Sequence, residues 1–223
     1  MPVPRGRPLI IPSVLSADFG CLRESLKGMS GKAGWIHLDI MDGHFVPNLS
    51  FGPHIAACLR KATALGMDAH LMVRDPGLFI KPFADAGVGL ITVHAEIRGA
   101  WECVRKIKAL GLKAGLSLRP RTPLSRVLSR LKELDLLLLM SVEPGFGGQA
   151  FMPEALPRIS EARRAIAKTG RPIWLQVDGG INDRTAPLAV KAGADALVMG
   201  SAVFSRSDPA GFVGKLTKDL QRG

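Results

Sequence analysis

The chain has 223 residues, of which 47% are hydrophobic, and carries a formal net charge of +11. This length fits one large domain or two small ones, and no apolar run reaches the roughly 18 residues that a membrane helix needs. The excess of Lys and Arg comes without a nucleic-acid-binding module or a set of stacking aromatic residues. We therefore expect a solvated basic surface, with nucleic-acid binding as a distant alternative.

Apolar, β-branched runs alternate with amphipathic segments along the chain. Eight strands are predicted, near residues 9–14, 35–41, 67–73, 89–94, 112–118, 134–142, 172–178 and 195–199. Eight helices are predicted, near residues 18–29, 53–64, 76–86, 99–110, 123–132, 154–169, 183–192 and 208–221. Glycines that end helices follow five of these segments, namely Gly66, Gly87, Gly111, Gly170 and Gly193.

Strands that are buried on both faces and alternate with helices indicate a parallel sheet. Eight such repeats in this length predict an α/β protein with one (β/α)8 TIM barrel over residues 1–223. An open, doubly wound sheet is the structural competitor. Such a fold usually has a glycine-rich motif after the first strand, whereas this chain has Ser13-Val-Leu-Ser-Ala-Asp18 there.

The cysteines and the N-terminal stretch bear on the compartment. Cys21, Cys58 and Cys103 are widely spaced, form no CxxC motif and suit a reducing environment. The stretch MPVPRGRPLI lacks the apolar core of an export signal. We therefore expect a cytoplasmic protein.

Histidine and aspartate side chains recur near the carboxyl ends of the second, third and seventh strands. Alternation in the second strand places His37 and Asp39 on one face, His70 lies late in the third strand, and Asp178 ends the seventh. The carboxyl ends of barrel strands form the usual active-site face. Four such nitrogen and oxygen ligands suit Zn²⁺, Fe²⁺, Mn²⁺ or Co²⁺. Taken alone, the pair of His37 and Asp39 would more often be a core histidine with a capping aspartate.

Glycine-rich segments follow the last three strands: residues 143–149, Gly179-Gly180 and Gly200-Ser201. Glycines allow backbone N–H groups to approach an anion, although they also make ordinary tight turns. Barrels of this kind commonly bind phosphate with the loops after strands seven and eight. The sequence therefore favours a phosphate site on the same rim as the candidate metal ligands.

Asp39 and Asp178 lie on strands that are three apart around a ring of eight, so their carboxylates can oppose each other. Opposed carboxylates can remove a proton from one side of a carbon and return one from the other side. A metal ion would stabilise the oxyanions that form. This combination indicates an enzyme that inverts the configuration of a carbon next to a carbonyl group in a small phosphorylated substrate.

Longer motifs add a resemblance to a known family. They are IPSVLSADF at 11–19, HLDIMDGHFVPN at 37–48, HLMV at 70–73, MSVEPGFGGQ at 140–149, QVDGGI at 176–181 and GS at 200–201. Together they resemble ribulose-phosphate 3-epimerase. The resemblance implies an isomerase of pentose phosphate metabolism with a ribulose-phosphate-binding-type phosphate site. Such an enzyme interconverts D-ribulose 5-phosphate and D-xylulose 5-phosphate through an enediolate.

The resemblance also implies roles for individual residues. By motif, His37, Asp39, His70 and Asp178 bind one divalent metal ion, with Zn as first choice and Fe, Mn or Co as alternatives. Asp39 and Asp178 are the paired acid and base. Substrate contacts come from Ser13, His70, Gly145, Phe146, Gly147, Gly148, Gly179, Gly180, Gly200 and Ser201. Met41, Met72 and Met140 match methionines beside the reacting carbons, although methionine is usually flexible core filler.

Expected partners follow from this resemblance: a small phosphorylated ketose and other copies of the chain in a homo-oligomer, but neither nucleic acid nor membrane. A D-allulose-6-phosphate 3-epimerase would keep the same motifs and is the nearest alternative. A decarboxylase or aldol-type synthase on a related barrel usually places a lysine beside the strand-end aspartate, and none stands beside Asp39.

Arg119-Pro120 departs from the family pattern, which usually has Asn or Lys before the proline. We hypothesise that Arg119 pairs with Glu143 and thereby braces the loop Gly145–Gly148. A solvated arginine that points away from the mouth is the alternative.

Overall fold

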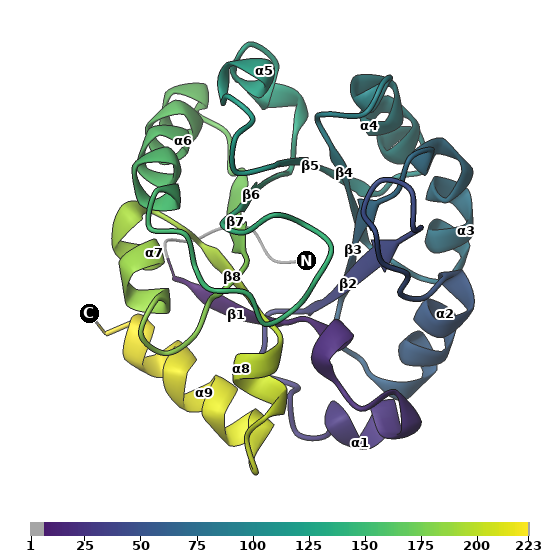
Figure 1. Cartoon of the computed structure of the whole chain (residues 1–223), viewed down its shortest axis with the longest axis vertical. Coiled ribbons are helices and arrows are strands. Elements are labelled where there is room, and N and C mark those ends of the chain that lie inside the picture. The colour runs from purple at the N-terminus through teal and green to yellow at the C-terminus, as the bar shows by residue number, and fades with distance from the viewer. Residues whose placement is uncertain (1–6, 223) are drawn as a thin grey trace.

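The computed structural model describes residues 7–222, and the strands among them form one parallel eight-stranded sheet with helices outside it (Figure 1). The strand order is β1-β8-β7-β6-β5-β4-β3-β2. The strands are β1 (Leu9–Pro12), β2 (Ile36–Met41), β3 (Met67–Met72), β4 (Leu90–His94), β5 (Lys113–Leu118), β6 (Leu136–Met140), β7 (Trp174–Asp178) and β8 (Ala196–Met199). The predicted (β/α)8 barrel is confirmed.

Helices surround the sheet in chain order. They are α1 (Leu22–Ser25), α2 (Pro53–Ala62), α3 (Ile80–Asp85), α4 (Ala100–Ala109), α5 (Ser125–Leu128), α6 (Ala155–Thr169), α7 (Ala186–Ala192), α8 (Ser201–Phe204) and α9 (Pro209–Leu220). The predicted helix over 18–29 is much shorter, because the Asp18 carboxylate accepts the Gly20 N–H at 2.8 Å and stabilises a 3-10 turn there. α8 was not predicted, since four residues are too few to show a helical period.

The barrel closes unevenly around its circumference. Seven neighbouring pairs of strands share three to six paired residues each. Between β1 and β2 the residue pairing is reduced to one isolated parallel bridge, which joins Ser13 to His37, with a backbone hydrogen bond from the Gly34 N–H to the Ile10 carbonyl at 3.1 Å beside it. This seam therefore runs directly beside the candidate site.

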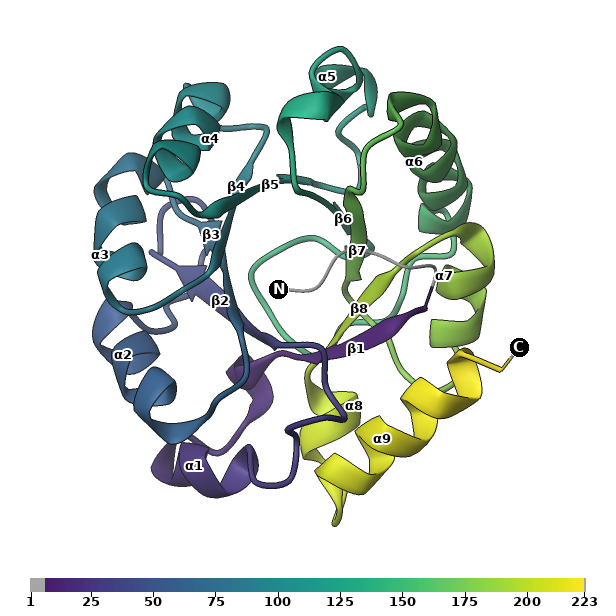
Figure 2. The ribbon, with the colours of Figure 1, turned by 180° about the vertical axis from the view of Figure 1, so that it is seen from behind.

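Strand residues alternate between an outer and an inner core. Ile36, Leu38 and Ile40 of β2 belong to the outer core between the sheet and the helices, as their spacing predicted. The inner core extends from the amino-terminal end of the barrel, the end that faces the viewer in Figure 2, to Met140 and Val198 at the base of a cavity. At the amino-terminal end Trp35 and Trp174 meet edge-to-face with ring centroids 5.1 Å apart. The barrel is thus plugged at one end, and a site can open only at the other.

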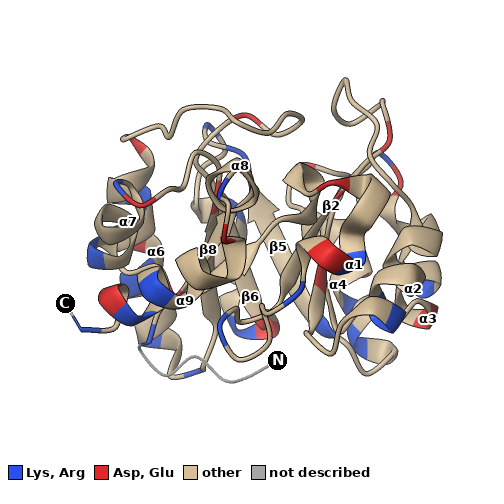
Figure 3. Ribbon diagram, turned by 90° about the horizontal axis from the view of Figure 1, so that it is seen from below, with Lys and Arg blue, Asp and Glu red and all other residues tan. Residues whose placement is uncertain are grey.

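The charge distribution follows the outer layer. In the side view of Figure 3, Lys and Arg are spread over α2, α6 and α9, with acidic residues between them. Within residues 7–222, no helix has both the length and the apolar character that crossing a bilayer requires. The expectation that no export signal is present concerns residues 1–10, of which the first six lie outside the described part of the chain.

Candidate metal and substrate site

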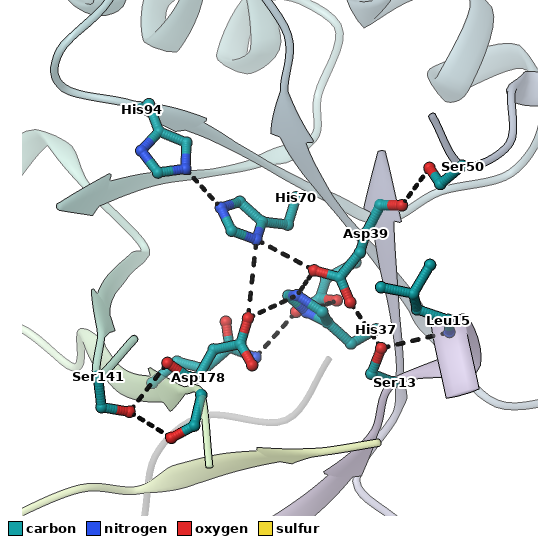
Figure 4. A network of polar contacts seen from close by, with 12 residues as sticks. Ser13, Leu15, His37, Asp39, Ser50, His70, His94, Ser141 and Asp178 are labelled. Carbon is teal, nitrogen blue, oxygen red and sulfur yellow. Dashed lines mark hydrogen bonds and ion pairs between the residues drawn. The ribbon is translucent and has the colours of Figure 1, made fainter. Parts of the chain in front are cut away.

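Four side chains from β2, β3 and β7 meet inside the carboxyl end of the barrel (Figure 4). His37 Nε2 lies 3.3 Å from Asp39 Oδ1 and 3.9 Å from Asp178 Oδ2. His70 Nδ1 lies 3.4 Å from Asp39 Oδ1 and 3.9 Å from Asp178 Oδ2. The structure thus brings the predicted quartet together, with one donor atom from each residue within 4.8 Å of all the others.

The spacing of these atoms suits a metal ion. Ligands at about 2.1 Å from a tetrahedral ion lie about 3.4 Å from one another, close to the separations in the quartet. His37 Nε2 is completely buried and has no hydrogen-bond partner among the described residues. Burial alone would lower the pKa of His37, but the charges of Asp68 and Asp39 raise it well above the usual value. The site therefore favours a positive charge at this point, either a proton or a metal ion.

Asp68 holds the far side of the His37 ring. Its Oδ1 lies 2.7 Å from His37 Nδ1, and its Oδ2 accepts hydrogen bonds from Trp35 Nε1 at 2.8 Å and Gln176 Nε2 at 3.0 Å. Metal binding at Nε2 needs the lone pair of that nitrogen, so the ring proton then sits on Nδ1, facing Asp68. Such an outer carboxylate fixes the tautomer and strengthens the ligand. The sequence motifs did not reveal this role for Asp68.

His70 is supported from behind by a second chain of polar groups. His70 Nε2 lies 2.9 Å from His94 Nε2, and His94 Nδ1 lies 3.0 Å from Glu96 Oε2. Burial lowers the pKa of His94 to about 4. Burial of Glu96 acts to raise the pKa of its carboxyl, but hydrogen bonds from His94 and Thr122 lower it to about 2.

At neutral pH these pKa values indicate which nitrogen atoms of His70 and His94 carry a proton. Ionised Glu96 accepts the Nδ1–H of neutral His94, which leaves His94 Nε2 as an acceptor for His70 Nε2–H. The Nδ1 lone pair of His70 is then turned toward Asp39 and Asp178. Both histidines of the quartet therefore present a lone pair to the same point. The sequence places His94 at the end of a strand without indicating a role, and no motif pointed to Glu96.

The two aspartates of the quartet differ in protonation in the metal-free protein. Burial acts to raise the pKa of Asp39, but the neighbouring His37 charge holds it well below the usual value. Ser13 Oγ–H also donates to Asp39 Oδ2 at 2.6 Å. Burial and the neighbouring Asp39 charge raise the pKa of Asp178 to about 7. One carboxylate is thus ready to accept a proton while the other retains one.

A cavity of about 910 Å³ opens above the quartet toward the carboxyl face of the barrel. His37 and His70 are fully buried beneath it, whereas both aspartates reach its wall. All the other residues expected to contact substrate also line it, as do the three methionines: Ser13, Met41, Met72, Met140, Gly145, Phe146, Gly147, Gly148, Gly179, Gly180, Gly200 and Ser201. The candidate metal and phosphate sites therefore share one chamber.

Comparison with known proteins agrees with this geometry. A model of the Ribulose-phosphate 3 epimerase family matches residues 9–204. The chain belongs to the ribulose-phosphate 3-epimerase family. The ribulose-phosphate 3-epimerase of Bacillus subtilis (strain 168) is 46% identical over 202 residues, which cover 89% of this chain and 93% of that protein. The enzyme of the same name from Mycobacterium tuberculosis H37Rv is 45% identical and covers 96% of this chain and 93% of its own.

The family extends to plants: the chloroplastic ribulose-5-phosphate-3-epimerase of Arabidopsis thaliana is 43% identical, with 91% of this chain and 73% of that protein covered. Solved structures show the fold more widely. A mutant tryptophan synthase α-subunit from Pyrococcus furiosus superposes with a TM-score of 0.71 at 17% identity, covering 98% of this chain and 99% of that one. The structure of a 3-hexulose-6-phosphate synthase superposes with a TM-score of 0.70 at 17% sequence identity, covering 94% of this chain and 98% of that one.

In this member of the epimerase family, the loop between β6 and α6 arches over the mouth of the barrel (Figure 1). The Gln149 side chain donates to the carbonyls of Glu143 and Phe146, at 2.7 and 2.9 Å, and so holds the arch in shape. Asn48 Nδ2 donates to the Gly145 carbonyl at 2.9 Å and ties the arch to the loop after β2.

At Gly180, chain packing requires a glycine in addition to any role in the predicted phosphate site. Its φ is +64°, and a Cβ there would overlap the backbone nitrogen of Phe151. A glycine is therefore required because the end of the β6–α6 loop packs directly on the loop after β7. At Gly147, by contrast, a Cβ would have only Ser16 Oγ within 4 Å, at 3.7 Å, so the missing side chain leaves space open to the cavity.

The predicted pair between Arg119 and Glu143 is wrong. No ion pair among residues 7–222 joins them; Arg119 Nη2 donates instead to the Phe45 carbonyl at 3.0 Å. Its guanidinium lies 4.3 Å from the centroid of the Phe45 ring, and its backbone N–H donates to Glu96 Oε1 at 2.9 Å. Arg119 turns toward the loop after β2, where Nη2 donates to a carbonyl and the guanidinium lies beside an aromatic ring, although its buried Nε has no hydrogen-bond partner among the described residues. Glu143, by contrast, is exposed.

Proposed function

We propose that this protein interconverts D-ribulose 5-phosphate and D-xylulose 5-phosphate by moving a proton at carbon 3. The observation that carries the proposal is the meeting of Asp39 and Asp178 from separated strands at the floor of one chamber. Carboxylates placed in this way can act on opposite sides of a single carbon. Family membership and 43–46% identity to proteins that bear this name support it.

In this mechanism Asp39 and Asp178 work as a pair. In one direction Asp39 takes the proton from carbon 3, and the electron pair moves toward the adjacent carbonyl to give an enediolate. Asp178 then gives its proton to the other side of carbon 3, which inverts that centre. In the reverse direction the roles exchange. Ser13 keeps Asp39 in place through the hydrogen bond to Oδ2.

The quartet His37, Asp39, His70 and Asp178 is proposed to hold the divalent metal ion. Bound there, the ion would supply Lewis-acid stabilisation of the negative charge that develops on the substrate oxygens. Imidazole and carboxylate donors without thiolate favour Zn²⁺ first, with Fe²⁺, Mn²⁺ and Co²⁺ as alternatives. Asp68 and the His94–Glu96 pair orient the two histidines for this ligation.

The phosphate of the substrate is proposed to lie at the opposite end of the chamber, against Gly179, Gly180, Gly200 and Ser201. α8 begins at Ser201 directly after β8, and the first N–H groups of a helix have no acceptor within it. This is where barrels of this type commonly bind phosphate. Gly145–Gly148 of the arching loop would cover the bound sugar phosphate.

The deciding experiment is an assay of D-ribulose 5-phosphate conversion with metal-loaded and chelated protein, combined with analysis of the bound metal. We expect turnover in the loaded protein, loss on chelation and recovery on adding back one equivalent of metal. Absence of conversion by the loaded protein would overturn the proposal. Parallel assay of D-allulose 6-phosphate distinguishes the alternative epimerase, which requires the higher kcat/KM on the hexulose.

The setting of the enzyme is also a proposal. We propose that it is a cytoplasmic homo-oligomer and that the chain is a single domain. Light scattering after gel filtration tests it, and a monomer at micromolar concentration would contradict it.

A further inference from the structure

The loop that joins β2 to α2 does not line the substrate chamber, but it contacts the arch over the chamber through Asn48, which donates to the Gly145 carbonyl. Residues 42–48 of this loop, here called the β2 loop, are anchored where they leave the strand. The Asp42 carboxylate accepts the N–H of Phe45 at 2.8 Å and the N–H of Arg74, at the end of β3, also at 2.8 Å. These bonds fix the start of the loop, and the Gly43 N–H, which donates to the Asn48 carbonyl at 2.9 Å, joins its two ends. Side-chain contacts add a further hold on Phe45 between them.

Phe45 is the point at which the middle of the β2 loop is held. The centroid of its ring lies 4.6 Å from the centroid of the His94 ring. The Arg119 guanidinium lies 4.3 Å from the centroid of the Phe45 ring. Arg119 Nη2 also donates to the Phe45 carbonyl at 3.0 Å. A planar guanidinium can stack on a ring and donate in its own plane at the same time. Arg119 thus fixes both the backbone and the side chain of Phe45.

Two connections carry the position of Phe45 to the site. The first is His94, which Phe45 covers and which holds His70 at 2.9 Å. The second is the rest of the β2 loop: Val46 packs with Met41 and Met72 under the cavity, and Asn48 donates to the Gly145 carbonyl at 2.9 Å.

We propose that Arg119 is a positioning residue, which clamps Phe45 so that the β2 loop supports the arch over the substrate chamber. Arg119 itself does not line the chamber, so it acts through Phe45 rather than by touching substrate. The kinetic part of the proposal rests on the proposed epimerase function. The structural part, a clamped loop, does not.

The test compares Arg119→Gln and Arg119→Lys with Arg130→Gln. Arg130 is the matched control, because its guanidinium also lies over an aromatic ring, Trp101 at 4.2 Å, but on the outer layer of the barrel. In both Arg119 variants we expect faster amide hydrogen exchange in residues 42–48 and 143–149. We also expect the substrate KM to rise on the order of threefold to tenfold, with kcat changed less than about twofold.

At saturating metal, bound metal per chain should stay unchanged in these variants, because all four proposed ligands remain and Arg119 contacts none of them directly. Arg130→Gln should leave both exchange and KM as in the wild type. Arg119→Lys keeps the charge but cannot stack and donate in one plane, so wild-type behaviour of this variant would overturn the proposal. Unchanged exchange in residues 42–48 of Arg119→Gln would also overturn it.

A double-mutant cycle with Phe45→Leu isolates the clamp itself. If Arg119 acts through Phe45, Arg119→Gln should add little to KM once the ring is gone, and strict additivity would reject the clamp. If the wild type failed to convert the pentulose phosphate, that result would contradict the proposed function but not the clamp. The exchange measurements would still decide the clamp.

Discussion

The two halves of the barrel interior bury different chemistry. The half formed by β2–β4 is polar, and its buried inward side chains include His37, Asp39, Asp68, His70, Thr92 and His94. The half formed by β6–β8 is mainly apolar, with Leu136, Leu138, Trp174, Ala196 and Val198 in the inner core. The difference shows that a barrel can bury ionisable groups where they form a connected set, each serving as partner to the next. The apolar half supplies the rigid packing against which that set is held.

The largest effect should come from the two carboxylates where the polar half meets β7. We expect Asp39→Asn and Asp178→Asn each to lower kcat by about a thousandfold, since an amide cannot take up and return a proton. Circular dichroism should show an unchanged fold. One variant retaining exchange of a single substrate proton with solvent would agree with one base per face. Epimerisation near the wild-type rate in either variant would reject the two-base assignment.

The apolar half should determine stability rather than metal binding. Leu138 is fully buried in the inner core, so Leu138→Ala should lower the free energy of unfolding by about 3 kcal/mol through lost burial and a cavity. Denaturant titration measures this loss. Metal affinity of the folded variant should stay at the wild-type value. A parallel fall in metal affinity would show that the two halves are not separable.

Asp68→Asn tests whether the polar half of the barrel interior determines metal binding. The variant should bind the metal ion about 10- to 100-fold more weakly, because His37 loses the carboxylate that fixes its tautomer. Metal titration measures the effect. The matched control is Asp195→Asn, since Asp195 is also a buried carboxylate but accepts the N–H of Leu175 at the amino-terminal end of the barrel, at 2.9 Å. That variant should lose stability and keep its metal affinity; equal loss of affinity in both would contradict the assignment.

The smallest effect concerns Glu96 and depends on pH. Its pKa of about 2 lies below the ordinary 4.5, so the folded state favours the ionised form. The stabilisation is therefore present above about pH 4.5 and disappears as the pH falls toward 2. We expect wild type to exceed Glu96→Gln by about 1 kcal/mol in the free energy of unfolding at pH 7, a modest value because Glu96 is partly exposed. A difference that grows on acidification would contradict this origin.

The fold could be predicted because the spacing of apolar residues along the sequence distinguishes strands from helices. The eight strands and the longer helices each repeat a pattern over enough residues to distinguish a period of two from one of 3.6. Segments of one turn, such as α1, α5 and α8, have no room for such a repeat. Their extent depends instead on local hydrogen bonds, such as the one from Gly20 to Asp18.

The site was predictable where its residues follow strand alternation. The same alternation in Met67–Met72 places Asp68 on the face of His70, so the sequence does contain a signal for Asp68. Glu96 lies beyond the end of β4, where alternation no longer applies. The partner of Arg119 is a loop residue 74 positions away, and irregular backbone gives no rule for such a contact.

The seam between β1 and β2 has a consequence for how the barrel holds itself shut. A single bridge, between Ser13 and His37, pairs the strands there, and the Gly34 N–H donates to the Ile10 carbonyl at 3.1 Å beside it. Fewer paired residues therefore join these two edges than join any other neighbouring pair of strands. Local opening of a protein favours such places. The quartet spans the seam, with three ligands from β2 and β3 on one side and Asp178 of β7 on the other. An ion held by all four would act as a cross-link between the edges of the sheet, much as a disulfide staples two distant segments.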